Sequence, residues 1–270
     1  MLDYILLFLI GIIGGFLAGL IGIGGGVLYI LILPYLLLEM GYPDAEIVQF
    51  TIANSLVGTM FAALSGNIAL ILKKEFYWKE VIIMGGFATV CSLLCLNLVV
   101  NTPFYQRDKF NLVVIGLLLF IAYRTLKGTR KQPNPEMHPI EDLKIGGIGA
   151  LAGILSALSG LGGGVIIISA LNLKFNVDMK KAKSISLGVI FISSFIMSIS
   201  NLFESPVLEL KGNNIGYIVW PLALILSAGV VIGSPLGVRF ARKLSNRTIS
   251  YIFVLFLVVV IVDKLLQLIA

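Results

Sequence analysis

Two glycine-rich stretches carry the groups of this sequence best suited to hold a ligand. The first reads L-I-G-I-G-G-G-V from Leu20 to Val27, and the second reads L-S-G-L-G-G-G-V from Leu158 to Val165, 138 residues further on. Three consecutive glycines break a helix because of their conformational entropy. A break followed by a new helix leaves backbone N–H groups without partners beside the positive end of the helix dipole. Each stretch therefore predicts a place where backbone amides bind an anion.

Six glycines and three side chains make up the predicted anion site. The glycines are Gly24, Gly25, Gly26, Gly162, Gly163 and Gly164. Further along each copy, T-I-A-N-S-L and K-S-I-S-L align on Ser55 and Ser186 and add two hydroxyls and the amide of Asn54. Neutral donors of this kind are sufficient for an oxyanion in a dry site. Serines also join membrane helices to one another, so the two serines stay open between binding and packing.

Other glycines of the repeat predict close helix packing instead. They stand four residues apart, as Gly11, Gly15 and Gly19 in the first copy, matched by Gly149, Gly153 and Ala157 in the second. This spacing puts small residues on one helix face, where two membrane helices approach closely. For three consecutive glycines we favour a ligand cavity, since packing rarely needs three in a row. A dinucleotide loop is excluded, because Val27 and Val165 occupy the third glycine position of G-x-G-x-x-G.

The composition places these glycines in a membrane. Of the 270 residues, 58% are hydrophobic and 13% are charged, and the mean hydropathy is +1.02, which excludes an ordinary soluble domain. The sequence contains apolar runs near 4–22, 25–40, 46–72, 80–100, 108–126, 145–161, 163–173, 183–202, 215–238 and 248–268. We expect an all-α, polytopic membrane protein with about five helical segments in each half. The run 163–173 is about half as long as the roughly 20 residues needed to cross a bilayer.

The basic residues predict how these segments are threaded. Suppose each glycine-linked pair of segments enters and leaves on one side. Then 16 of the 20 lysines and arginines fall on one set of loops, and only Arg107, Lys109, Lys211 and Lys264 fall on the other. Because cytoplasmic loops are rich in Lys and Arg, we place both termini outside and the central loop in the cytoplasm. An odd number of segments in each half then makes the halves inverted repeats, a common architecture of secondary transporters.

The halves are joined by a polar, proline-containing segment. We expect a first membrane repeat at 1–127, a cytoplasmic linker at 128–144 and a second membrane repeat at 145–270. The linker contains His138, the only histidine, for which solvent exposure is the simplest interpretation. The net charge of +6 reflects topology, so we expect no nucleic-acid partner.

Several kinds of chemistry are missing from the sequence. Cys91 and Cys95 are four residues apart with no histidine or carboxylate near them, so we expect small apolar packing, with a sulfur-handling role as the alternative, and no metal or other cofactor. No carboxylate falls deep within an apolar run, the nearest being Asp263, so a carboxylate proton relay is not expected. Motifs of intramembrane enzymes are also absent, so we do not expect an enzyme.

The paired G-I-G-G-G-V and G-L-G-G-G-V stretches, with serine-bearing segments behind them, resemble the sulfite exporter TauE/SafE family, also called TSUP. The resemblance extends to the two homologous halves, the polar central loop and the ending G-S-P-L-G-V-R-F-A-R-K-L from Gly233 to Leu244. It implies export or import of small sulfur-containing or carboxylate anions such as sulfite, thiosulfate and sulfonates. One departure is Asn172, which aligns with Pro34, so the two hairpins need not end alike.

Together these features predict a multi-pass secondary transporter of a small sulfur-containing or organic anion in the cell membrane. Its expected partners are that anion and the lipid bilayer, and a homo-oligomer is left open. An anion channel would use the same glycines without alternating access. A membrane scaffold that transports nothing, and binds a partner through its basic loops, is the other alternative.

Overall fold

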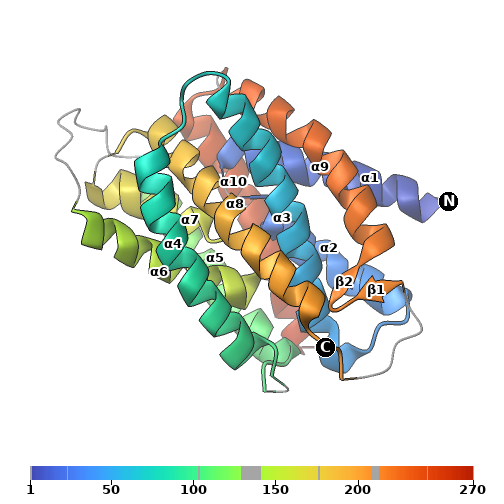
Figure 1. Cartoon of the computed structure of the whole chain (residues 1–270). Coiled ribbons are helices and arrows are strands. Elements are labelled where there is room, and N and C mark those ends of the chain that lie inside the picture. The colour runs from blue at the N-terminus through green and yellow to red at the C-terminus, as the bar shows by residue number, and fades with distance from the viewer. Residues whose placement is uncertain are drawn as a thin grey trace.

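The computed structural model describes residues 2–22, 24–102, 104–128, 141–175, 177–207, 213–241 and 243–269. The elements of the first half are α1 (Leu2–Ile21), α2 (Gly26–Glu39), η1 (Asp44–Glu46), α3 (Ile47–Ile71), α4 (Trp78–Cys95), η2 (Leu96–Val100) and α5 (Arg107–Gly128). Those of the second half are α6 (Asp142–Ser159), α7 (Gly164–Ser169), η3 (Ala170–Lys174), α8 (Met179–Phe203), β1 (Asn214–Ile215), β2 (Ile218–Val219), α9 (Trp220–Ala241) and α10 (Asn246–Ile269). Figure 1 labels the principal helices and both strands.

Within these residues, six helical segments are long and apolar enough to cross a bilayer. They are α3 with η1, α4 with η2, α5, α6, α8 and α9. The prediction of a polytopic, helical membrane protein is therefore confirmed. One departure is local, because the run predicted from residue 215 begins with the antiparallel β1–β2 hairpin and becomes helical only at Trp220.

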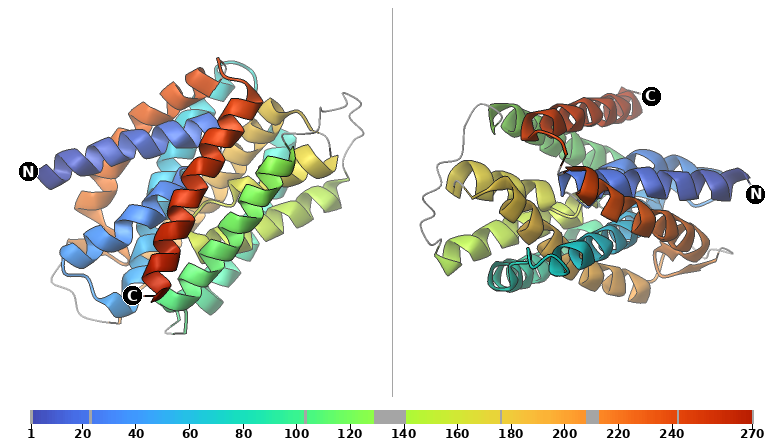
Figure 2. Two further views of the ribbon diagram at one scale, coloured as in Figure 1. Left: turned by 180° about the vertical axis from the view of Figure 1, so that it is seen from behind. Right: turned by 90° about the horizontal axis from the view of Figure 1, so that it is seen from above.

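The two halves of the chain pack through matched pairs of helices. In this arrangement α1 packs along α9 as α6 packs along α4, while α3 packs on α8 and α5 packs on α10. In the same way α2 contacts α3, and α7 contacts α8. The α3–α8 pair crosses the middle of Figure 1, and α5 and α10 lie side by side on the opposite face in the left view of Figure 2. Each α-helix of the first half thus has a counterpart in the second half whose number is higher by five. Replacing every helix by its counterpart reproduces the same set of contacts.

The central helices α3 and α8 run antiparallel. At the start of α8, the Ser184 hydroxyl donates to the carbonyl oxygen of Glu75, just beyond the end of α3, at 2.6 Å. Beyond the other end of α8, the backbone N–H of Val207 donates to the carboxylate of Glu46, just before α3, at 2.9 Å. The hydroxyl of Tyr217 in the β hairpin donates to the same oxygen at 2.9 Å. Burial, together with this carboxylate, raises the pKa of the Tyr217 hydroxyl.

The two glycine-linked helix pairs differ after their turns. The first continues as α2, an α-helix of 14 residues with Pro34 inside it. The second continues as α7, which has only 6 residues before the chain widens into the π-helical η3. Within η3, the side-chain amide of Asn172 donates to the carbonyl oxygen of Val177 at 3.0 Å. The predicted difference between the ends of the two hairpins is therefore confirmed.

A glycine seam joins α1 to α9. It consists of Gly11, Gly15 and Gly19 on α1 facing Gly229, Gly233 and Gly237 on α9. A Cβ on any of these six residues would lie well inside contact distance of a carbonyl oxygen on the opposite helix. On α6, Gly149 and Gly153 approach carbonyl oxygens of α4 in the same way, at Met84 and Ala88. The predicted packing role of the spaced glycines is confirmed, and the glycines of α9 are their unpredicted partners.

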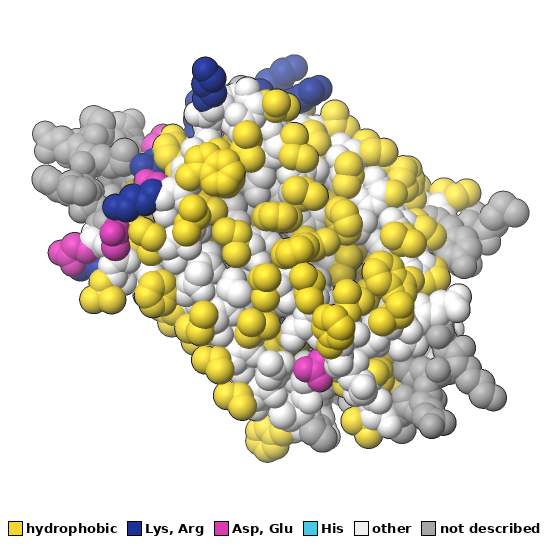
Figure 3. Space-filling view, viewed as in Figure 1, with side chains coloured by type: hydrophobic (Ala, Val, Ile, Leu, Met, Phe, Trp, Pro, Cys, Tyr) yellow, Lys and Arg dark blue, Asp and Glu magenta, His cyan; other side chains and the backbone are white. Residues whose placement is uncertain are grey.

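The surface agrees with a chain surrounded by lipid. In Figure 3, hydrophobic side chains cover most of the visible face, and the visible Lys and Arg side chains gather at its upper and left edges. Lys73 and Lys74, between α3 and α4, are exposed. By contrast Lys264, which the charge count assigns to the other side, lies within α10 and is completely buried. His138 and most of the linker lie outside the described residues.

Candidate functional site

The two glycine stretches fold into matching turns. The first glycine turn contains Gly22, Gly24, Gly25 and Gly26, and the second contains Gly160, Leu161, Gly162, Gly163 and Gly164. The φ angles are 84° at Gly22, 84° at Gly24, 75° at Gly25, 69° at Gly160, 81° at Gly162 and 69° at Gly163. L residues with side chains rarely adopt such angles, so these positions require glycine. The expected break in the helix is present in both copies.

Each turn is held by a serine from the opposite half of the chain. The Ser55 hydroxyl on α3 donates to the carbonyl oxygen of Gly160 at 2.8 Å. In return, the Ser186 hydroxyl on α8 lies 3.0 Å from the carbonyl oxygen of Gly22 and 3.2 Å from that of Gly164. All of these residues are buried. The two turns and the two predicted serines therefore meet at one place in the middle of the fold.

Two further side chains, which the sequence does not single out, lie between the turns. A Cβ on Gly24 would lie 2.6 Å from the methyl group of Thr59 and 3.2 Å from Cγ2 of Ile190. A Cβ on Gly162 would meet the same two atoms at 2.8 Å and 3.2 Å. Thr59 on α3 and Ile190 on α8 are four residues beyond Ser55 and Ser186, so they occupy equivalent positions in the repeat. A guest between the turns requires these two side chains to move.

The turns present buried backbone donors. Among the described residues, the N–H groups of Gly25, Gly26, Gly163 and Gly164 have no hydrogen-bond partner. The carbonyl oxygens of Gly25 and Gly163 instead accept from the first turns of α2 and α7. Buried backbone N–H groups are nearly always paired in folded proteins. Four that are not, in two turns that pack against each other, are suited to a negatively charged guest.

The predicted Asn54 has its amide engaged within the protein. Its Nδ2 donates to the carbonyl oxygens of Phe50 at 2.8 Å and Tyr217 at 3.0 Å. Its Oδ1 accepts from the backbone N–H of Val219 at 3.0 Å. In this conformation Asn54 attaches the β hairpin to α3. Its polar atoms are therefore directed to the hairpin and to its own helix.

Lys183 contributes a positive charge beside the first glycine turn. The sequence places it among the loop cations, whereas the structure places it in α8, one turn before Ser186. Its Nζ donates to the carbonyl oxygen of Leu20, at the end of α1, at 3.2 Å, and its side chain lies close to Gly22. The three-residue spacing from Ser186 is the sequence signal that could have identified it, since such residues share a helix face.

The described residues contain no candidate metal-binding site. They contain no group of three or more His, Cys, Asp and Glu side chains that could hold an ion. Cys91 and Cys95 both lie on α4 as partly buried free thiols. The groups available at the turns are therefore backbone amides, hydroxyls and one ammonium group, which can bind an anion but supply neither a nucleophile–base pair nor a metal.

Comparison with known proteins gives a match over nearly the whole chain. The family model described as Sulfite exporter TauE/SafE matches residues 7–263. A probable membrane transporter protein of Methanocaldococcus jannaschii is 31% identical over 248 residues, covering 90% of this chain and 88% of the relative. A probable membrane transporter protein of Haemophilus influenzae is 27% identical over 276 residues, covering 99% of this chain and 100% of the relative.

A further relative, from Bacillus subtilis, also bears the name probable membrane transporter protein. It is 25% identical over 273 residues, covering 96% of both chains. No solved structure matches this chain.

Proposed function

This chain belongs to the sulfite exporter TauE/SafE family of multi-pass membrane transporters, which are not enzymes, and from that premise we propose that it transports a small sulfur-containing or organic oxyanion. The proposed class comprises sulfite, thiosulfate, sulfonates and similar anions. The name of the family suggests sulfur, and the glycine turns suggest a small anion independently. The proposed binding groups are the backbone amides of Gly24–Gly26 and Gly162–Gly164, lined by Ser55 and Ser186, with Asn54 supporting the site through the β hairpin.

The observation that carries this proposal is the meeting of two turns with buried, unpartnered amides. Gly25 and Gly26 contribute from one half of the chain, and Gly163 and Gly164 contribute from the other. Each set precedes a helix, so the partial positive charges at these helix ends add to the donors. Irregular backbone within a membrane is tolerated only where it is buried in protein or lines a water-filled cavity. Lys183 adds an amino group that can carry a positive charge nearby.

We propose alternating access of two inverted repeats as the mechanism. The antiparallel course of α3 and α8 and the exchange of equivalent helix contacts support this arrangement. Thr59 and Ile190 fill the space between the turns in the present conformation. Their displacement toward either side would admit the anion from that side only. Rigid seams between α1 and α9 and between α6 and α4 would let each pair move as a unit.

The proposed setting follows from the charge distribution. We place the protein in the cell membrane with both termini outside and the central loop in the cytoplasm. The proposed organisation remains two membrane repeats, 1–127 and 145–270, with the linker 128–144 between them. Cysteine labelling of the loop that contains Lys73 and of the segment after Met40, from either side of the membrane, would test this orientation.

The binding site can be tested with Gly164→Ala. Gly164 is the first residue of α7 and its φ is not positive, so alanine fits the backbone. The added Cβ would lie 2.5 Å from Cδ1 of Ile190, 2.7 Å from Oγ of Ser186 and 3.1 Å from the carbonyl oxygen of Gly22. It would therefore narrow the space between the turns. Because the added methyl group would keep the anion away from the donors of the turns, we expect uptake of sulfite, thiosulfate or a sulfonate into proteoliposomes to fall at least about tenfold.

Gly147→Ala is the matched control for this substitution. Gly147 lies on α6, and a Cβ there would meet nothing within 4 Å. Uptake by this variant should equal that of the wild-type protein, and both variants should elute as folded protein in size-exclusion chromatography. Equal uptake by both variants would contradict the site. Flux that does not saturate and shows no counterflow would instead identify a channel, and no anion flux at all would favour the scaffold alternative.

A further inference from the structure

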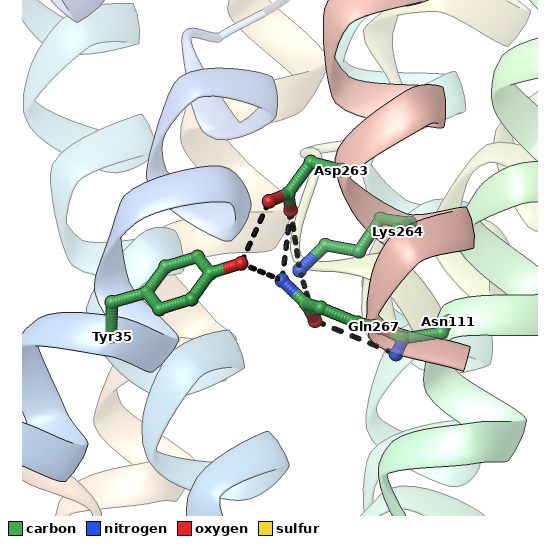
Figure 4. Close-up of polar contacts among 5 residues, drawn as sticks. All are labelled: Tyr35, Asn111, Asp263, Lys264 and Gln267. Carbon is green, nitrogen blue, oxygen red and sulfur yellow. Dashed lines mark hydrogen bonds and ion pairs between the residues drawn. The ribbon is translucent and has the colours of Figure 1, made fainter. Parts of the chain in front are cut away.

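A second polar cluster lies away from the glycine turns, where α2, α5 and α10 meet (Figure 4). The Tyr35 hydroxyl donates to Oδ1 of Asp263 at 2.7 Å. The side-chain amide of Gln267 donates to the Tyr35 hydroxyl at 2.9 Å and to Oδ2 of Asp263 at 2.8 Å. On its other side, Oε1 of Gln267 accepts from Nζ of Lys264 at 3.1 Å. The cluster thus connects the helix after the first glycine turn to the last helix of the chain.

Lys264 is the unusual member of this cluster. Its side chain is completely buried, at 0% exposure, within a helix of a membrane protein. Its ammonium lies 3.7 Å from Oδ2 of Asp263, a longer contact than its hydrogen bond to Gln267. A buried charge among membrane helices is costly and usually faces a cavity or a partner with a functional role. The anion site at the glycine turns does not use this lysine.

Lys264 borders a small cavity. It lies between α2, α3, α5 and α10, and its polar lining residues are Thr51, Arg107, Asn111, Lys264 and Gln267. The space open to the centre of a water molecule is about 10 Å³. This is close to the least space that holds one water molecule, so a somewhat larger guest, such as a halide, requires the lining side chains to shift slightly. Sulfite or a sulfonate, with three oxygens around sulfur, is too large for it.

The charges that line this cavity are both positive. Arg107 and Lys264 contribute to the lining, whereas their carboxylate partners do not. Asp44 pairs with Arg107 at 3.1 Å and is 63% exposed, so solvent screens it. Asp263 is directed toward Tyr35 and Gln267. The charged side chains that line the cavity are therefore both cations.

Unpartnered donors also face this region. Among the described residues, Thr51 Oγ1 and Arg107 Nε are buried without a hydrogen-bond partner, and so is one acceptor, Asn111 Oδ1. Thr51 and Asn111 are completely buried. A buried donor without a partner lowers the stability of the fold. A guest that accepts hydrogen bonds would remove this cost at Thr51 and Arg107.

From the cavity, its two cations and these donors, we infer that this site binds a monovalent anion of halide size, held by Lys264, Arg107 and the hydroxyl of Thr51. The site is separate from the glycine turns and independent of what they carry. It would stabilise the contact of α2 and α3 with α5 and α10. Because α2 follows the first glycine turn, occupancy would also fix the far end of that hairpin.

Bromide is the probe for this site, since it scatters X-rays anomalously. We expect crystals of the full-length protein grown in sodium bromide to show an anomalous peak beside Lys264 and Thr51. In solution, bromide should raise the thermal unfolding midpoint in a saturable way, compared with sodium gluconate at constant ionic strength. Thr51→Val keeps the shape and removes the hydroxyl, so the bromide concentration for half the effect should rise about tenfold.

Thr89→Val is the matched control, because the Thr89 hydroxyl on α4 is also buried without a partner but lies outside this cavity. This variant should respond to bromide as the wild-type protein does. Lys264→Met tests the charge, and its response to bromide should disappear if the variant folds. A cavity that holds only water, with no anomalous peak, would overturn the inference. So would an equal bromide response in the wild type and in Thr51→Val.

Discussion

In the glycine seam between α1 and α9, each glycine has ordinary helical backbone, and only the space for a Cβ is missing. At the glycine turns the backbone itself excludes other residues, since φ is 84° at Gly24 and 81° at Gly162. The neighbours differ as well. Seam glycines face carbonyl oxygens of the opposite helix, whereas Gly24 and Gly162 face the methyl groups of Thr59 and Ile190.

This difference separates a rigid contact from an adaptable one. Backbone oxygens in a helix cannot move without breaking the helix, so the seam holds α1 and α9 together as one unit. Side-chain ends can change rotamer at small cost, so the centre between the turns can open. Glycine content alone therefore does not distinguish the part of this protein that holds its shape from the part that we propose to bind the substrate.

The largest effect is expected for valine in the seam. At Gly19 a Cβ would collide with the carbonyl oxygen of Ser234, and the neighbouring atoms of α9 are also backbone. We expect Gly19→Val to destabilise the protein by more than about 4 kcal/mol and to abolish the folded peak in size-exclusion chromatography. Gly116→Val on α5 is the control, since nothing lies within 4 Å of its Cβ position. Similar folded yields for the two variants would show that the seam is not rigid.

An intermediate effect is expected for alanine at Gly163. This residue has a φ of 69°, and its Cβ would collide with the carbonyl oxygen of Ala152. Backbone strain and overpacking together should cost about 2 to 4 kcal/mol, measured as a lower thermal unfolding midpoint. In Gly147→Ala, by contrast, alanine should stabilise α6 by about 0.5 to 1 kcal/mol. Equal stability of the two variants would contradict the assignment of strain to the turns.

The same reasoning limits what larger substitutions at the turns can show. Valine at Gly25 or Gly163 combines a positive φ with a close backbone neighbour, Gly14 in the first case and Ala152 in the second. Loss of transport in such a variant would not separate a damaged site from a damaged fold. Gly164→Ala avoids this difficulty, because two of the three atoms nearest its Cβ belong to side chains.

The smallest effect is expected from the two serines that hold the turns. Ser55→Ala and Ser186→Ala each remove a hydrogen bond between the halves, which should lower stability by about 1 kcal/mol. Because the turns would lose their alignment, we expect uptake at low substrate concentration to fall about threefold to tenfold. Ser193→Ala is the control, since its hydroxyl donates only to carbonyl oxygens of its own helix. Unchanged uptake in all three variants would remove the serines from the site.

Much of the fold could be predicted from local patterns. The apolar runs determine the helices, and the repeated glycines determine where two of them break, because both depend on residues close together in the chain. The spacing of Gly11, Gly15 and Gly19 also predicts a packing face. It does not identify α9 as the partner, because many helices in this chain carry small residues and the choice depends on long-range contacts.

The details of the candidate site needed the tertiary structure for the same reason. The sequence identifies Ser55 and Ser186 as candidates. It does not show that each serine forms a hydrogen bond with the glycine turn of the opposite half. Nothing in the sequence distinguishes Thr59 and Ile190 from other threonines and isoleucines. Their position between the two turns is visible only in the tertiary structure. When the topology is inferred from the charges of the loops, Lys264 is treated as a residue at the membrane surface. Only the packing of α2, α3 and α5 around α10 shows that it is buried.

The sequence by itself determined that the chain is helical, crosses a membrane several times and breaks two helices at equivalent glycines. Those properties follow from side-chain hydropathy and backbone freedom, which each residue carries wherever it lies. Only the tertiary structure decided which helices meet, which serine supports which turn and which cations are buried. Those properties depend on residues far apart in the chain occupying the same space, and no local pattern specifies that.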